Sequence, residues 1–446
     1  MDPINLHDYE KLSPFEIKDE LIRLARTSGQ AAAHMYLNAG RGNPNWVATR
    51  ARGIFFLLGQ FAISEAKRGM THPAGLAGMP KADGMADRLR VWLERQEAGP
   101  EAAGAGALIR FALETFSFQP DGFVHELIDA IIGDNYPVPD RMLIHAEPVV
   151  HEYLMRAMCG EPRPPGRFDL FAVEGGTAAI SYLFRSLMAN RLLRPGDRIA
   201  IGTPIFTPYL EIPELEDYGL EPVYVDAPRE NRFQFTDAEL AKLKDPRVKA
   251  FFLVNPGNPT SVAISPEARL KIADLVRTRR PDLMLLTDDV YATFVDGFRS
   301  LLGELPRNTI GVYSYSKYFG ATGWRLGVIA IHQDNIFDRA IAALSASDLQ
   351  HLDRRYGSLA LEPRAIRFID RLVADSRDVA LNHTVRPIAA ATGDDDAVLS
   401  GRAGRPGTIL SDRMQRPAAP SRHGDARWSG PARDPWAFVR QLLRID

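Results

Sequence analysis

Residues 314–327 read Ser-Tyr-Ser-Lys-Tyr-Phe-Gly-Ala-Thr-Gly-Trp-Arg-Leu-Gly. This stretch sets Lys317 in a turn of small residues and Arg325 a short distance after it. A lysine amine condenses with a carbonyl to form a Schiff base, and nearby hydroxyl and guanidinium groups neutralise a phosphate. The stretch therefore suits a cofactor with an aldehyde and a phosphate, and pyridoxal phosphate is the candidate. Alone it is weak support, because most lysines are solvated surface charges.

Two upstream strand-like segments end in polar residues that suit the same cofactor. Residues 282–287 predict a buried strand, and Asp288 and Tyr291 follow at its carboxyl end, where open α/β sheets bind ligands. An aspartate there can pair with a protonated pyridine nitrogen, and a tyrosine can hydrogen-bond the phenolic oxygen of the ring. A helix N-cap is the alternative role for Asp288. Residues 250–254 predict another apolar strand, which leads into the turn Asn255-Pro256-Gly257-Asn258-Pro259-Thr260.

A third strand-like segment ends in a glycine turn. Residues 171–173 run into Glu174-Gly175-Gly176-Thr177 and then into an apolar helix. A glycine turn that leads into a helix N-terminus is a phosphate site. A lone Gly-Gly-Thr is only a turn signal, but several such strand ends in one order are hard to obtain by chance.

In this order the motifs resemble those of the fold-type-I pyridoxal-phosphate enzymes, the aspartate aminotransferase-like family, over about residues 130–330. The resemblance implies that Lys317 forms the Schiff base as the catalytic residue and that Asp288 pairs with the pyridine nitrogen. It implies that Asn258 and Tyr291 bind the phenolic oxygen and that Phe206 stacks on the cofactor. The other cofactor contacts that it implies are Gly176, Thr177, Ser314, Arg325 and Tyr136.

The amino-terminal part is similar to one branch of this family, the aspartate 4-decarboxylases, also called L-aspartate β-decarboxylases. The likeness rests on the apolar run 55–63, on residues 135–139 and on residues 36–46, which read Tyr-Leu-Asn-Ala-Gly-Arg-Gly-Asn-Pro-Asn-Trp. A guanidinium flanked by glycines can approach a carboxylate closely and bind it with two parallel hydrogen bonds. The likeness therefore implies that Arg41 binds the substrate. A solvent-exposed loop arginine is the alternative.

Composition favours a cytoplasmic enzyme. The chain of 446 residues has 54 Lys plus Arg against 56 Asp plus Glu, a net charge of −2, so no strong field attracts nucleic acid or anionic membranes. Cys159 is the single cysteine, which excludes an internal disulfide and fits a reducing compartment. No apolar run is long enough to span a membrane, and the start of the chain does not resemble a signal peptide. The ten histidines show no metal-ligand spacing, so we expect no metal.

The pattern of apolar segments predicts an α/β fold with a large, doubly wound, mostly parallel sheet. Its strand-like runs are 168–173, 198–202, 221–225, 249–254, 283–287, 309–314 and 326–331. Residues 12–36 and 334–383 read as helical. We expect an N-terminal arm, part of a small domain and a family-specific insertion in residues 1–130, and the cofactor-binding domain in 131–333. The connecting helix and the start of a C-terminal small domain follow in 334–384.

The segment 385–446 differs from the rest in composition. It holds ten arginines, no lysine, six prolines and six glycines, without sustained helix or strand periodicity before residue 436. We expect a poorly ordered tail and an incomplete small domain. One interpretation is a natural basic tail. The other is a shifted reading frame after Thr384, because the codons for residues 385–396, read one nucleotide later, permit a peptide similar to that of the decarboxylases.

Three functions follow as alternatives. The first is conversion of L-aspartate to L-alanine and carbon dioxide, with minor transamination, by a homodimer or larger homo-oligomer. The second is an aspartate-type aminotransferase of class I/II. The third is a cofactor-binding remnant of the decarboxylase, since the family resemblance implies a C-terminal arginine on the substrate α-carboxylate and no arginine of the segment 385–446 matches it. Arg41 and the long leader favour the first over the second, and the composition of the tail favours the third.

Overall fold

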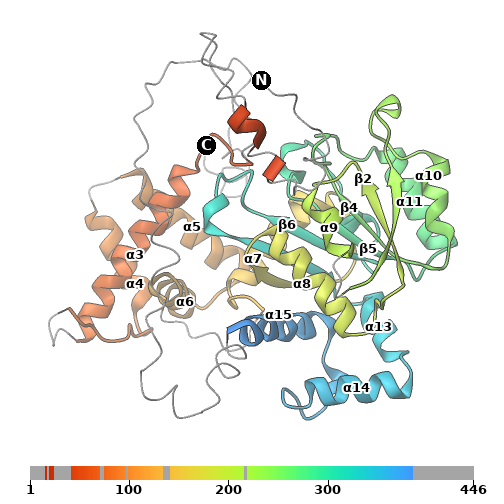
Figure 1. The fold of residues 1–446 in the computed structure, drawn as a ribbon. Helices are drawn as coiled ribbons and strands as arrows, with labels where there is room; N and C mark the ends of the chain where they lie inside the picture. Colours follow the sequence, from red (N-terminus) through yellow and green to blue (C-terminus); the bar gives the residue numbers. More distant parts are fainter. Residues whose placement is uncertain are drawn as a thin grey trace, which may run out of the picture.

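The structure is a computed structural model that describes residues 16–17, 20–24, 42–70, 75–96, 99–133, 141–214 and 218–384. Its centre is one sheet with helices on both faces (Figure 1). The strands are β1 (Phe168–Val173), β2 (Arg198–Thr203), β3 (Glu221–Asp226), β4 (Val248–Val254), β5 (Met284–Asp288), β6 (Thr309–Ser314) and β7 (Gly327–His332). Each strand agrees with its predicted bounds to within one residue, so the α/β prediction is confirmed.

The sheet has the strand order β1-β7-β6-β5-β4-β2-β3. Strands β3, β2, β4, β5 and β6 are parallel, whereas β7 is antiparallel to both of its neighbours. The expected mostly parallel sheet is therefore confirmed. Strands β5 and β6 are buried at every residue, as expected for parallel strands that are covered on both faces.

Two hydrophobic cores cover the faces of the sheet. One core packs α8 (Gly176–Ala189) against the sheet through Ile180, Leu183 and Leu187, which have no exposed surface. The other core packs α11 (Pro266–Thr278) through Ile272 and Val276. Burying each such side chain stabilises the fold by about 1.5–3 kcal/mol. The remaining helices around the sheet are α7 (Ala146–Leu154), α9 (Pro208–Glu214), α10 (Asp237–Ala241) and α12 (Leu301–Glu304).

Four helices before the sheet have a core of their own. They are α3 (Thr49–Gly69), α4 (Met85–Arg95), α5 (Pro100–Phe116) and α6 (Pro120–Ile132), and they lie to one side of the sheet (red to orange in Figure 1). Their core contains Phe61, Val124 and Ile128. The predicted boundary between residues 130 and 131 falls in the last turn of α6, which ends at Ile132, and the division into domains stays a prediction.

Three helices follow the sheet, where helical structure was expected. They are α13 (Ile336–Ala342), α14 (Ala346–Tyr356) and α15 (Phe368–Thr384), and α15 packs against α8. Residues 12–36 were also expected to be helical. The structure describes 16–17 and 20–24 of this range, and these residues are helical. Arg41, Tyr136 and the segment 385–446 lie outside the described residues.

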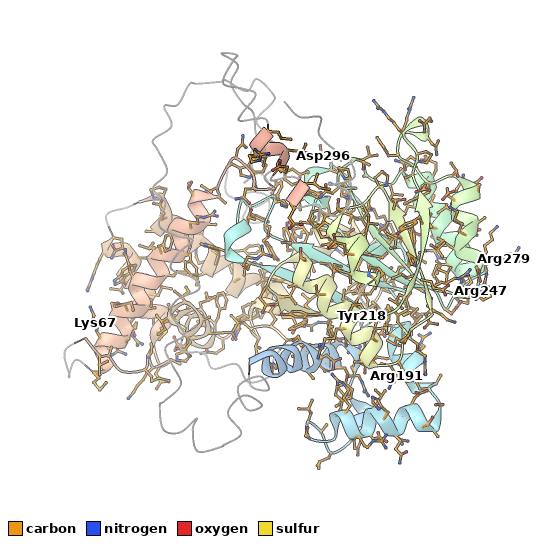
Figure 2. All side chains as sticks on the ribbon, in the orientation of Figure 1. Lys67, Arg191, Tyr218, Arg247, Arg279 and Asp296 are labelled. Atoms are coloured by element: carbon orange, nitrogen blue, oxygen red, sulfur yellow. The ribbon has the colours of Figure 1, made fainter. Side chains whose placement is uncertain are left out.

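Charged side chains mark the periphery of the fold. Lys67 projects at the end of α3, and Arg247 and Arg279 project from the opposite side of the molecule (Figure 2). In the described part of the chain, no helix is both long and apolar enough to cross a membrane. Within the same residues, no three His, Cys, Asp or Glu side chains are grouped to hold a metal ion.

Candidate active site

The sheet topology brings the predicted cofactor residues to one edge. The parallel strands β2, β4, β5 and β6 all end there, and their carboxyl ends precede or carry Phe206, Asn258, Asp288 and Ser314. Strand β1 ends at the same edge, because both it and β6 are antiparallel to β7. In this register, Gly327 at the start of β7 lies between Val173 and Ser314. Residues far apart in the sequence therefore meet as the strand pattern predicted.

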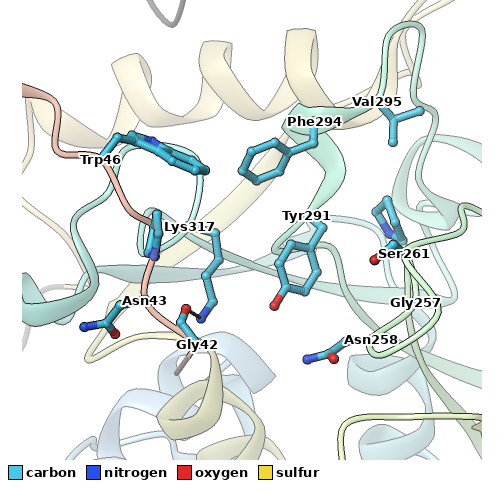
Figure 3. Close-up of a pocket in the computed structure, with 12 residues that line it drawn as sticks. Gly42, Asn43, Trp46, Gly257, Asn258, Ser261, Tyr291, Phe294, Val295 and Lys317 are labelled. Atoms are coloured by element: carbon cyan, nitrogen blue, oxygen red, sulfur yellow. Dashed lines mark hydrogen bonds between the residues drawn. The ribbon is translucent and has the colours of Figure 1, made fainter. Parts of the chain in front are cut away.

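Two adjoining cavities occupy this edge and share Asn258, Tyr291 and Lys317. The inner cavity, of about 120 Å³, is lined by nine of the predicted cofactor residues: Gly176, Thr177, Phe206, Asn258, Asp288, Tyr291, Ser314, Lys317 and Arg325. The outer cavity, of about 410 Å³, adds Gly42, Asn43, Trp46, Phe294 and Val295 among its lining residues. Figure 3 shows the outer cavity, where the hydroxyl of Tyr291 points into the space between Lys317 and Asn258.

Asp288 is the buried acid of the inner cavity, with 4% of its surface exposed. The backbone N–H of Val290 donates to its Oδ1 (3.1 Å), and the hydroxyl of Tyr209 donates to its Oδ2 (2.8 Å). Burial raises the pKa of Asp288 to about 6, against the opposing effects of these two hydrogen bonds and of the Lys317 charge. The carboxylate is therefore positioned to attract a positive charge that replaces the lost solvent.

Lys317 is half-buried between the two cavities. Its Nζ donates to the carbonyl oxygen of Gly42 (2.6 Å), so the amino-terminal segment closes one side of the site. Burial lowers the pKa of Lys317 and the nearby Arg325 charge lowers it further, whereas the Asp288 charge raises it. A lowered pKa increases the fraction of neutral amine, the form that attacks an aldehyde.

Two glycines lie at the predicted phosphate site around Arg325, called the anion site below. A Cβ added to Gly175 would lie 2.6 Å from Nη2 of Arg325, and one added to Gly327 would lie 2.8 Å from the Cα of Gly175. Gly175 has φ +95°, a conformation that other residues rarely adopt. The turn therefore packs against the start of β7, and the N-terminus of α8 lies next to Arg325.

The guanidinium of Arg325 is held at this position by two backbone carbonyls. Its Nη1 donates to the oxygen of Thr322 (2.9 Å) and its Nη2 to the oxygen of Glu174 (2.9 Å). The positive end of the α8 dipole and the fixed cation favour a phosphate here. The hydroxyl of Ser314 donates to Ser316 Oγ (2.9 Å) within the same cavity wall.

The sequence interpretation missed several lining residues. The most consequential is Tyr209, which is 2% exposed and contacts Asp288 directly. The sequence signal for Tyr209 was its position three residues after Phe206 in the same motif. In the structure the two rings pack edge to face, with centroids 5.2 Å apart. Other residues not predicted for the cavity walls are Ser316, Thr322, Trp46 and Phe294.

The described residues fit pyridoxal phosphate. A fixed cation at a helix N-terminus suits its phosphate, a buried carboxylate suits its ring nitrogen, and an amine with a lowered pKa suits its aldehyde. These contacts converge on one cavity from five different strand ends. The roles of the individual residues stay predictions, as do those of Arg41 and Tyr136.

Comparisons with known proteins agree with this chemistry. Residues 170–399 match the family model described as aminotransferase class I and II. The chain is 51% identical over 374 residues to a bifunctional aspartate aminotransferase and L-aspartate beta-decarboxylase of a Pseudomonas species, covering 84% of this chain and 70% of that protein. It is 32% identical over 166 residues to an aspartate aminotransferase of Rhizobium meliloti strain 1021, covering 36% of this chain and 39% of the relative.

A comparison of folds also found aminotransferases. A double mutant of the Thermus thermophilus aspartate aminotransferase aligns over 88% of this chain and 77% of its own, with a TM-score of 0.42 and 17% sequence identity.

Proposed function

Because the chain belongs to the class I and II aminotransferase family, we propose that it catalyses the pyridoxal-phosphate-dependent β-decarboxylation of L-aspartate to L-alanine and carbon dioxide, with minor transamination. The family uses pyridoxal phosphate and acts on amino acids, which supports the cofactor and the substrate class. The decarboxylase assignment is supported by the bifunctional Pseudomonas relative, which this chain matches over most of both lengths.

The observation that carries the proposal is the convergence of Lys317 and Asp288 on one cavity with the anion site at Arg325. When bound, the cofactor supplies an electron-accepting ring that stabilises negative charge on the substrate carbons. Asp288 keeps the ring nitrogen protonated by presenting a buried negative charge. Lys317 moves a proton at the substrate Cα, since its lowered pKa suits general base catalysis. Tyr291 and Asn258 would hold the phenolic oxygen, and Phe206 would pack on the cofactor ring.

Substrate orientation requires a partner for at least one carboxylate. We assign this role to Arg41, on the strength of its glycine-flanked sequence, and Gly42, the next residue, does line the outer cavity. Replacing Arg41 with lysine keeps the charge but loses the two parallel hydrogen bonds, so we expect weaker aspartate binding.

A transaminase-only enzyme is the second candidate function. It is favoured by the aspartate aminotransferase among the relatives and by the aminotransferase activity in the name of the bifunctional Pseudomonas protein. The two functions share the cofactor and the proton transfer at Cα, and differ in whether the β-carboxylate leaves as carbon dioxide. Product analysis therefore separates them.

The test is an assay of the purified protein, loaded with pyridoxal phosphate, on L-aspartate. We expect carbon dioxide and alanine in equal amounts, with a small fraction of oxaloacetate. Oxaloacetate without carbon dioxide, released once per active site unless a 2-oxo acid is added to accept the amino group, would favour the transaminase instead. A protein that binds the cofactor and releases neither product would favour the non-catalytic remnant.

We further propose a homo-oligomer and a cytoplasmic location. Family members are typically oligomeric, which supports the first point. The single cysteine supports the second, because a chain with one cysteine forms no internal disulfide and fits a reducing compartment.

A further inference from the structure

We propose that Tyr209 is a positioning residue that keeps Asp288 ionised and aimed at the cofactor ring nitrogen, through the hydrogen bond from its hydroxyl. This inference rests on the proposed cofactor site and deepens it, because it names the residue that controls the charge of Asp288. Tyr209 lies in α9, and its side chain reaches Asp288 at the end of β5.

The geometry leaves this contact little freedom. Tyr209 and Asp288 are 2% and 4% exposed, and the hydroxyl lies 2.8 Å from Oδ2. The ring of Tyr209 packs against Phe206 on one side and Phe252 on another, with centroids 5.2 Å away in each case. Gly176 packs against the pair, since a Cβ there would lie in van der Waals contact with both, 3.6 Å from Oδ2 of Asp288 and 3.7 Å from the Tyr209 hydroxyl.

The direction of the hydrogen bond follows from acidity. Burial and the Asp288 charge raise the pKa of Tyr209 far above its usual range, so the phenol keeps its proton and donates it. Two donors then hold the carboxylate, one on each oxygen, since the backbone N–H of Val290 binds Oδ1. Donors to the charged form favour that form, which opposes the effect of burial on Asp288.

Other charged and titratable groups also lie near Asp288 and interact with its charge. Lys317, after β6, favours its ionised form, whereas the neighbouring Asp289, the first residue after β5, interacts with it as a like charge. Tyr291 faces it from the following turn, and burial together with the Asp288 charge raises the pKa of that hydroxyl. Arg325 acts on Lys317. Of the side chains that face Asp288, Tyr209 donates the hydrogen bond to it.

The consequence concerns cofactor binding as a function of pH. Without the Tyr209 hydroxyl, the pKa of Asp288 in the cofactor-free protein rises by about one to two units, the usual strength of a hydrogen bond to a charged group. Below that pKa the carboxyl is neutral and must lose its proton before it pairs with a protonated ring nitrogen. The affinity for pyridoxal phosphate should therefore weaken at low pH and stay unchanged at high pH.

The experiment measures the Kd of pyridoxal phosphate for the full chain from pH 6 to pH 9. We expect the ratio of Kd for Tyr209→Phe to Kd for the natural protein to be near one at pH 9 and roughly 5- to 50-fold at pH 6. Tyr313→Phe is the matched control, because it removes another buried hydroxyl that contacts Tyr153 and Thr293 instead. It should leave the ratio near one throughout.

Two outcomes would overturn the inference. A ratio that does not change with pH would give Tyr209 only a packing role, and an equal pH-dependent loss in Tyr313→Phe would show an indirect effect. A double variant supplies a further check, since Tyr209→Phe in an Asp288→Asn background should have no pH-dependent effect. If the natural protein binds no pyridoxal phosphate at any pH, the proposed function fails, and that result is distinct from a failure of the Tyr209 assignment.

Discussion

Asp288 and Asp289 are consecutive buried carboxyl groups with different surroundings. Asp288, the last residue of β5, meets Tyr209 at the cavity, whereas Asp289, the first residue after the strand, has other partners. Asp289 accepts hydrogen bonds from the hydroxyls of Thr287 (2.6 Å) and Ser300. Burial raises the pKa of Asp289 to about 7, against these hydrogen bonds. One acid therefore serves the site and the other ties β5 to the turn before α12.

The raised pKa of Asp289 predicts a pH-dependent stability. In the unfolded chain this carboxyl ionises near pH 4, whereas in the folded chain it keeps its proton until about pH 7. The folded state binds more protons in this window, so the contribution of Asp289 to stability falls as pH rises from about 4 to 7 and is constant above it. We expect Asp289→Asn to lack this pH dependence. The free energy of unfolding of the natural protein minus that of the variant should be lower at pH 8 than at pH 5, by on the order of 2 kcal/mol.

Urea unfolding of both proteins at pH 5 and pH 8 measures this difference. An equal stability difference at the two pH values would contradict the assignment of a raised pKa to Asp289.

Lys317 carries the most direct prediction at the residue scale. Lys317→Ala should lose the covalent bond to the cofactor and lower turnover by at least about 10²- to 10⁴-fold, because it removes both the amine and the base. Phosphate contacts at Arg325 and α8 should still bind pyridoxal phosphate weakly. Borohydride reduction followed by mass spectrometry detects the bond. Lys271→Ala is the control, since Lys271 is an exposed lysine paired with Asp237, and a reduced adduct surviving in Lys317→Ala would refute the assignment.

At the scale of elements, a buried polar network joins the site to the C-terminal helices. Asp375 of α15, which is 1% exposed, accepts hydrogen bonds from Ser186 (2.6 Å) and Asn190 (3.1 Å) at the end of α8. It also accepts from Arg355 (2.7 Å) and Tyr356 (2.9 Å) of α14. The helix whose N-terminus lines the anion site is thus fixed at its other end by the helices that follow the sheet.

Breaking this network should destabilise the whole fold. Asp375→Ala removes the carboxylate partner of Arg355 and leaves the buried side chains of Ser186 and Asn190 without it, so we expect a loss of about 3–5 kcal/mol in the free energy of unfolding. Urea denaturation followed by circular dichroism measures it. Ser376→Ala is the matched control, because that hydroxyl bonds only the carbonyl of Val373 in its own helix among the contacts described. A loss below about 1 kcal/mol in Asp375→Ala would contradict the prediction.

The sequence was most informative where local pattern and topology coincide. Apolar runs predicted the seven strands of the sheet, and the motifs at the strand ends, together with the family resemblance, predicted nine lining residues of the inner cavity. Tyr209 was missed although it lies in the same motif as Phe206, because its contact with Asp288 joins residues 79 positions apart and no local pattern predicts that pairing. The Asp375 network was missed for the same reason, since Asp375 of α15 and its partners on α8 and α14 lie far apart in the sequence. Pyridoxal phosphate dependence is confirmed by the family match, whereas individual roles remain to be tested.

At the scale of the whole molecule, exposed aromatic side chains gather beside the site. Phe55 lies 5.1 Å from Trp324 and 5.7 Å from Phe56, and these rings are 38%, 40% and 59% exposed, respectively. Arg52 covers the ring of Trp324 at 5.1 Å and donates through Nη2 to the carbonyl of Gly320 (2.6 Å). Contiguous exposed apolar surface of this kind is typical of a protein interface. The outer cavity opens nearby, where Trp46 and Phe294 are also partly exposed.

This aromatic patch, Phe55, Phe56 and Trp324, gives a test of the proposed homo-oligomer. Phe56→Arg puts a charge on the patch without changing the core of α3, because Phe56 is 59% exposed. If a second copy covers the patch, the buried charge costs several kcal/mol and the oligomer dissociates at micromolar concentration. Light scattering should then report a lower mass with an unchanged thermal unfolding of the monomer. Leu361→Arg is the matched control, since Leu361 is fully exposed on the loop between α14 and α15 and should leave the mass unchanged. A Phe56→Arg protein that keeps the mass of the natural protein would place the interface elsewhere.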